Sequence, residues 1–202
     1  MRRITIALSF ALLVPALAGA EPVTYKVDSD HSGVAFTIRH FVTNVSGRFH
    51  DFTGVVKYDR QNPAASSVEF TVQATSIATD NDNRDNHLRS PDFFDVAKFP
   101  TWTFASTKVA PKGTDALEVT GDLTIKGVTK RVTLPIQVLG TMKTPKGEKA
   151  GFETAFTIDR KDYGIEWNRV LDTGGAMLGN DVKINIALET NKQAPPEPAK
   201  AG

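Results

Sequence analysis

The sequence predicts an all-β protein, an antiparallel sandwich or barrel of about eight or nine short strands. Three observations predict this fold class. Apolar and polar residues alternate with a period of two, turn residues separate the alternating segments, and no long segment has the period of a helix. Parallel strands joined by crossover helices are therefore not expected.

The alternating segments begin near the N-terminus and recur along the chain. The first clear one places Val34, Phe36 and Ile38 on one face. The later ones place further large apolar residues at the same spacing: Phe70, Val72, Trp102, Phe104, Val119, Leu134, Ile136, Phe152, Phe156 and Ile158. Additional strands are expected at 25–30, 52–59 and 182–188, with turns at 61–63, 111–113 and 145–147.

The segment 75–100 interrupts the alternation, because it is polar and charged. Residues 82–89 have the composition of two helical turns. Ser90, Pro91 and Asp92 then resemble the start of a second short helix over 91–96. So long a segment inside a compact domain is either a functional lid or a crossover that plugs one end of the barrel.

Pro135 stands in the middle of an expected strand, where proline cannot donate to a neighbouring strand. The sequence therefore predicts either a seam in the sheet or a bulge at this position. A seam would offer a surface for a homodimer.

The first twenty residues have the organisation of a secretory signal peptide. Arg2 and Arg3 precede an apolar run that ends in Ala18-Gly19-Ala20, the small residues that a signal peptidase recognises. The run is short for a membrane span, although an uncleaved anchor is the alternative. We expect a signal peptide at 1–20, a barrel domain at 21–190, a disordered tail at 191–202, and a periplasmic location.

Charge and cysteine content exclude several classes of protein. Without Arg2 and Arg3, 22 basic side chains face 23 acidic ones, a net charge of about −1, which does not suit binding to nucleic acid. No second apolar run of membrane length follows, so no stable membrane insertion is expected. The chain has no cysteine, so it has neither disulfides nor thiolate chemistry.

No catalytic or metal-binding motif is present in the sequence. The four histidines lack the spacing of zinc ligands, residues 80–91 fail the pattern of a calcium loop, and there is no nucleophile elbow. We therefore expect no catalytic residue, no metal and no cofactor. The apolar side chains remain, and they either fill the barrel or enclose one ligand.

Several motifs, in order along the chain, identify a family. They include YKVD at 25–28, FHDFTG at 49–54, RDNHLRSPDFF at 84–94 and GDLTIKGVTK at 121–130. The chain resembles the YceI-like family of exported lipocalin-like proteins. The resemblance implies an eight-stranded antiparallel barrel, often dimeric, with one or two short helices in 80–96. It further implies a long apolar cavity for a polyisoprenoid lipid, such as a prenyl phosphate or a quinone-like chain.

The first functional hypothesis is a non-enzymatic carrier or store for such a lipid. Its tail would contact the twelve apolar residues from Phe36 to Ile158 named above, while Arg84, His87 and Arg89 would form a polar mouth. A packed barrel that serves as an exported, stress-related protein-interaction module is the alternative. The third hypothesis is a hydrolase or isomerase acting on a small apolar substrate.

Overall fold

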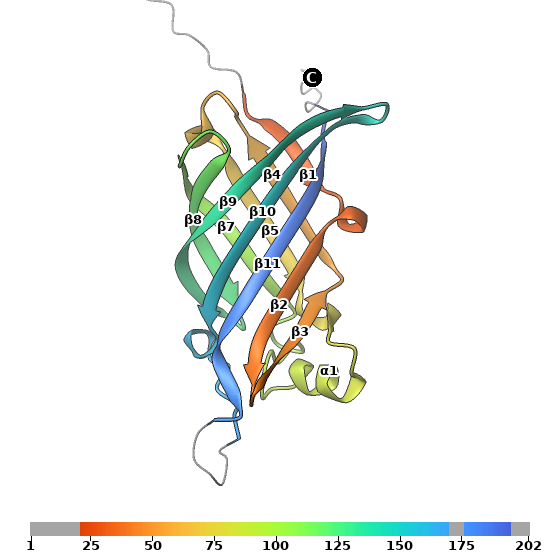
Figure 1. The fold of residues 1–202 in the computed structure, drawn as a ribbon, viewed down its shortest axis with the longest axis vertical. Coiled ribbons are helices and arrows are strands. Elements are labelled where there is room, and N and C mark those ends of the chain that lie inside the picture. The colour runs from red at the N-terminus through yellow and green to blue at the C-terminus, as the bar shows by residue number, and fades with distance from the viewer. Residues whose placement is uncertain (1–20, 170–175, 195–202) are drawn as a thin grey trace, which may run out of the picture.

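The computed structural model describes residues 21–169 and 176–194, so the expected signal peptide and most of the expected tail lie outside the described residues. Eight antiparallel strands close into the predicted barrel (Figure 1). Around the ring these strands are β1 (Val23–Val27), β4 (Phe52–Tyr58), β5 (Ser67–Gln73), β7 (Thr101–Pro111), β8 (Ala116–Ile125), β9 (Val128–Thr144), β10 (Gly147–Asp159) and β11 (Leu178–Lys192).

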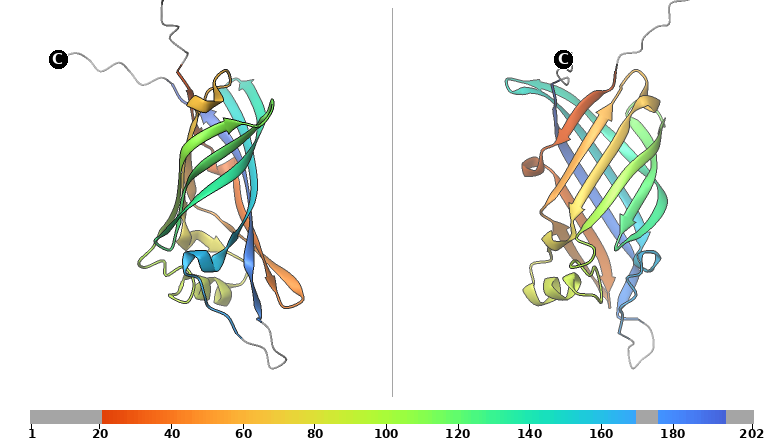
Figure 2. Two further views of the ribbon diagram at one scale, coloured as in Figure 1. Left: turned by 90° about the vertical axis from the view of Figure 1, so that its left-hand side faces the viewer. Right: turned by 180° about the vertical axis from the view of Figure 1, so that it is seen from behind.

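The last strand, β11, closes the ring and also carries an extension of the wall. Its end pairs with β1 through Thr190–Val27, and its beginning pairs with β2 (Gly33–His40) from Leu178 to Ala187. β3 (Thr43–Phe49) forms a hairpin with β2, and the two-residue β6 (Ile77–Ala78) pairs with β3. These strands lengthen one side of the barrel at the end where α1 (Asp82–Arg89) lies (Figures 1 and 2).

The barrel extends slightly beyond the predicted domain boundary. β11 continues through Asn191 to Lys192, and the backbone N–H of Gln193 donates to Thr24 O at 2.8 Å. The predicted tail began at 191, so its first residues belong to the sheet.

The expected helix at 82–89 is present, and hydrogen bonds fix it across one end of the barrel. Asn81 caps it by accepting from the Arg84 backbone N–H at 2.9 Å. Asp85 is buried and accepts from both the backbone N–H and the hydroxyl of Thr79. Arg89 donates to Thr75 O at 2.8 Å and to Ile77 O at 2.7 Å, which ties α1 to β6.

The expected second helix over 91–96 is wrong. Ser90 is the C-cap of α1, and the next residues form a series of turns. The backbone N–H groups of Phe93 and Asp95 both donate to Ser90 O, so this carbonyl holds together the turns that follow α1. The turns place Phe93 and the partly buried Phe94 against the hydrophobic core.

The seam expected at Pro135 exists between β9 and β10. Both strands continue, but their pairing stops at Gln137–Glu153, and Pro135 lies just beyond this last pair. On its other side Pro135 still stands opposite Glu118 of β8. The proline therefore lies on an edge that no strand covers, where a missing N–H has little cost.

Two inward-facing glycines allow phenylalanine rings to lie flat against the barrel wall. A Cβ on Gly54 would lie 2.5 Å from Cδ2 of Phe70, its partner on β5. A Cβ on Gly121 would lie 2.6 Å from Cζ of Phe104. Each ring lies in the space that a side chain at the glycine would need. The ring therefore protrudes less into the barrel interior than it would beside a larger residue.

Candidate ligand-binding site

The twelve apolar residues predicted to face inward all lie on the inner face of the barrel or its extension. Some of them are only partly buried although they point inward, among them Ile38, Phe70, Ile136, Phe156 and Ile158. Inward residues of a filled barrel would be fully buried. The accessible area that remains on these side chains indicates internal space.

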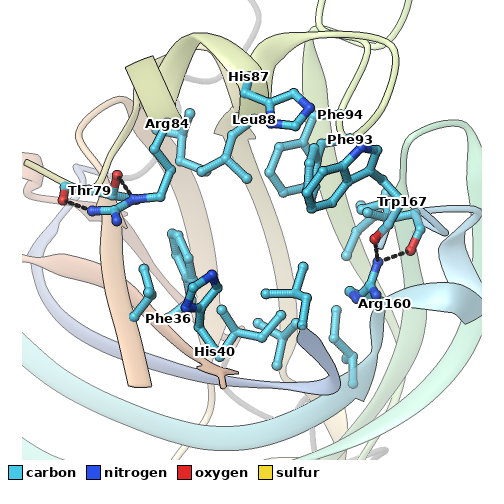
Figure 3. A pocket seen from close by; sticks show the side chains of 18 of the residues that line it. Phe36, His40, Thr79, Arg84, His87, Leu88, Phe93, Phe94, Arg160 and Trp167 are labelled. Atoms are coloured by element: carbon cyan, nitrogen blue, oxygen red, sulfur yellow. Dashed lines mark hydrogen bonds between the residues drawn. The ribbon is translucent and has the colours of Figure 1, made fainter. Parts of the chain in front are cut away.

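One space is the mouth cavity, which lies between α1 and the barrel and has a volume of about 380 Å³ (Figure 3). β2, α1, the turns after α1 and the segment 160–167 form its walls. Six predicted residues line it: Phe36, Ile38, Trp102, Ile158, Arg84 and His87.

A smaller inner cavity, of about 90 Å³, lies deeper in the barrel. It is lined by seven predicted residues: Phe70, Val72, Trp102, Phe104, Leu134, Ile136 and Phe156. Trp102 and Ile125 line both cavities, so these side chains lie where the two spaces approach each other.

Part of the barrel interior is closely packed. Val119 and Phe152 are 1 % and 5 % exposed and line neither cavity, although both were predicted ligand contacts. The ring of Phe152 packs edge-on against Tyr58, with centroids 5.7 Å apart. The interior is therefore hollow near α1 and closely packed around Val119 and Phe152.

The predicted polar mouth is only partly assembled. Arg84 lines the mouth cavity, but its guanidinium donates to Thr79 Oγ1 and Thr79 O, each at 2.7 Å. His87 also lines it and has Nε2 2.8 Å from Asp92 Oδ2. Arg89 is not among the lining residues, because its guanidinium is held by the carbonyls before α1.

The most deeply buried cation at the mouth cavity is Arg160, which is 2 % exposed. Its Nε donates to Gly179 O at 2.9 Å, and its Nη1 donates to Ile165 O at 2.7 Å and Trp167 O at 2.8 Å. Its Nη2 is buried and has no hydrogen-bond partner. Burial lowers the pKa of Arg160, and the nearby Asp159 opposes this only in part.

Sequence reasoning considered Arg160 only as one of several arginines near strand ends and chose other residues for the mouth, although a more specific signal for Arg160 was present. Phe156, Ile158 and Arg160 continue one period-two pattern, so the arginine falls at an inward position. Trp167 was also missed, and no pattern in its irregular segment could have found it. In the structure its ring packs against His87 and Phe93, with centroids 4.8 and 5.2 Å away.

One cluster of ionisable groups lies away from both cavities. Asp28, His31 and Glu189 have ligand atoms within 4.8 Å of one another. Lys149 Nζ lies between the acids, 3.1 Å from Asp28 Oδ2 and 2.5 Å from Glu189 Oε1. The hydrogen bond from Lys149 is the main cause that lowers the pKa of Asp28 to about 2. An ammonium group thus already occupies the position between the two carboxylates.

The fold and the site define a class of protein: a closed eight-stranded barrel with an apolar cavity beneath a short helix. The YceI-like domain matches residues 25–190, and the chain belongs to this family. "Protein YceI" of Escherichia coli O6:H1 is 40% identical over 190 residues, covering 92% of this chain and 97% of that protein. Its counterpart in Salmonella agona is 38% identical over 197 residues, covering 96% and 100%.

Solved structures share the fold. BcnA of Burkholderia cenocepacia has a TM-score of 0.73 at 27% identity and covers 81% of this chain and 98% of its own. The YceI protein of Campylobacter jejuni has a TM-score of 0.67 at 33% identity, with coverage of 78% and 91%. A domain from Saccharophagus degradans described as polyisoprenoid-binding has a TM-score of 0.63 at 17% identity, with coverage of 85% and 99%.

Among the described residues, no helix has both the length and the apolar character needed to cross a bilayer.

Proposed function

We propose that this protein is a non-enzymatic carrier or store for a polyisoprenoid-type lipid, and that it works in the periplasm after its signal peptide is removed. The observation that carries the proposal is the pair of apolar cavities inside the barrel. The volume of the mouth cavity, about 380 Å³, falls within the range of about 300–1,000 Å³ typical of ligand pockets.

The energetics are favourable for an apolar chain. A tail that buries roughly 400 Å² of apolar surface gains on the order of 10 kcal/mol, at about 25 cal/mol per Å². Loss of free motion and ordering of the chain cancel a large part of that gain, which leaves micromolar or tighter binding. A tail longer than the mouth cavity would extend past Trp102 and Ile125, which line both cavities, toward the inner cavity.

A lipid carrier has a physical purpose in this compartment. A polyisoprenoid chain is insoluble in the aqueous space between two membranes, and a soluble barrel that covers the tail removes this obstacle. The family membership and the polyisoprenoid-binding description of one structural neighbour support the same ligand class.

The proposal is tested by mass spectrometry of lipid extracted from the natively purified protein. Phe156→Asp places a charge in the inner cavity, and we expect it to abolish lipid recovery. Thr157→Asp is the matched control, because Thr157 is exposed on the other face of β10. Circular dichroism checks that both variants fold. Absence of bound lipid in the wild type, together with no binding of added geranylgeraniol, would refute the proposal.

The second candidate function is a protein-interaction module, and the seam favours it. A groove of about 690 Å³ follows the unpaired edges of β9 and β10. It is lined by exposed residues such as Pro135, Glu153 and Ala155, and also by Ile136, which borders the inner cavity. A second copy of the chain is the simplest occupant. Sedimentation analysis of wild type and Ala155→Arg tests this: a dimer that Ala155→Arg dissociates supports it, and a wild-type monomer contradicts it.

A further inference from the structure

We propose that Arg160 binds the head group of the ligand, and that this head group is an anionic oxygen group, a carboxylate or a phosphate. The inference rests on the proposed function, because it assumes that the apolar tail of the same molecule occupies the mouth cavity. Figure 3 shows Arg160 at one side of this cavity and Arg84 at the other.

The first argument is the unused donor. Three hydrogen bonds to Gly179, Ile165 and Trp167 occupy Nε and Nη1 of Arg160, and Nη2 remains without a partner although the side chain is 2 % exposed. Buried donors are almost always paired, because an unpaired one loses its hydration without compensation. A ligand oxygen beside Nη2 would restore that bond.

The second argument is charge. The described residues that line the mouth cavity include Arg84, Arg160, His40 and His87 but no aspartate or glutamate. The carboxylate next in sequence, Asp159, turns away to accept from the backbone N–H of Lys161 at 2.8 Å. An anionic head group would therefore neutralise a buried guanidinium, whereas an alcohol would leave its charge uncompensated.

The third argument is the position of Arg160 relative to the apolar surface. Arg160 follows Ile158 and Phe156 at the same two-residue spacing as β10 ends. Ile158 lines the mouth cavity and Phe156 lines the inner cavity. The inward side chains thus change from apolar to cationic where β10 ends and the 3-10 turn Arg160–Tyr163 begins, which matches a hydrocarbon tail followed by a head group.

Arg84 is a weaker candidate for the same role. Arg84 is an exposed residue, and Thr79 accepts two hydrogen bonds from its guanidinium. A water-exposed cation gains little from an anion, because hydration already stabilises its charge.

The test uses three ligands with the same fifteen-carbon tail: farnesyl monophosphate, farnesoic acid and farnesol. Quenching of tryptophan fluorescence reports binding, since Trp102 and Trp167 line the mouth cavity. We expect the wild type to bind the two anions at least about tenfold more tightly than the alcohol. Arg160→Met should reduce this ratio to near one. Arg48→Met should retain it, because Arg48 is exposed, pairs with Asp80 and does not line the mouth cavity.

Arg160→Met also removes donors from three carbonyl groups, so a second measurement uses the wild type alone. In protein labelled with ¹⁵N-arginine, farnesyl monophosphate should shift the guanidinium resonances of Arg160, and farnesol should not. Equal affinity for all three ligands, or an unshifted Arg160, overturns the inference and leaves the lipid-binding proposal intact. If none of the three ligands binds, the proposed function itself fails.

Discussion

Replacing Gly54 by alanine tests whether the flat position of the Phe70 ring keeps the inner part of the barrel open. The new Cβ would lie 2.5 Å from Cδ2 of Phe70 and 3.1 Å from Glu69 O. Carbon atoms in contact stay about 3.5–4.0 Å apart, so the ring must retreat by roughly 1 Å. Phe70 lines the inner cavity, and the direction of retreat is into that space.

Two effects of opposite sign determine the change in stability. Restricting the unfolded chain stabilises a glycine-to-alanine variant by about 0.4–1 kcal/mol. Overpacking against Phe70 costs about 1–3 kcal/mol. We expect a net loss of about 1–2 kcal/mol and a melting temperature lower by roughly 2–8 °C for a domain of this size. Gly33→Ala is the matched control, because a Cβ there meets nothing within 4 Å.

The assay combines thermal unfolding with binding of isoprenoid alcohols of increasing chain length. Gly54→Ala should be less stable than Gly33→Ala and should lose affinity for the longest chains first. A Gly54→Ala variant that matches the control in stability and in chain-length preference would show that Phe70 does not limit the interior space.

Two further predictions concern ion pairs and buried hydrogen bonds. Asp85→Ala removes the acceptor of two Thr79 hydrogen bonds, so the free energy of unfolding, measured by urea titration, should fall by about 1–3 kcal/mol. An unchanged free energy of unfolding would mean that these bonds do not hold α1 in place. The pKa of Asp28 is lowered from 3.8 to about 2, chiefly by Lys149, so its contribution to stability is present above pH 4 and is lost as the pH falls toward 2. Lys149→Met should therefore flatten the dependence of melting temperature on pH in this window, and an unchanged profile would contradict the assignment.

Much of the fold could be predicted because its determinants are local. The alternation through Phe36, Trp102 and Phe156 reports which face of each strand is apolar, and that pattern needs no knowledge of the neighbouring strands. The helix at 82–89 was likewise predictable from its polar composition. The second helix failed because Ser90 has the same sequence signature whether it begins a helix or ends one, and the preceding residues decide between them.

The interior could not be predicted in the same way. Phe70 and Phe152 carry the same pattern in the sequence, yet one borders a cavity and the other is packed against Tyr58. Whether an inward side chain meets empty space depends on residues from distant strands, such as the glycine opposite Phe70. The period-two pattern of a single strand gives no information about the residues of distant strands that face it.

The sequence by itself therefore determined the strand faces, the position of α1 and a discontinuity at Pro135, because each follows from the conformational preferences of a few adjacent residues. Only the tertiary structure decided that β9 and β10 separate there, that the barrel is hollow near α1 and closely packed around Val119 and Phe152, and that Arg160 is buried with a free donor. Cavities and unpaired donors are what remains after distant segments have packed against one another, so they become visible only when all of those segments are in place.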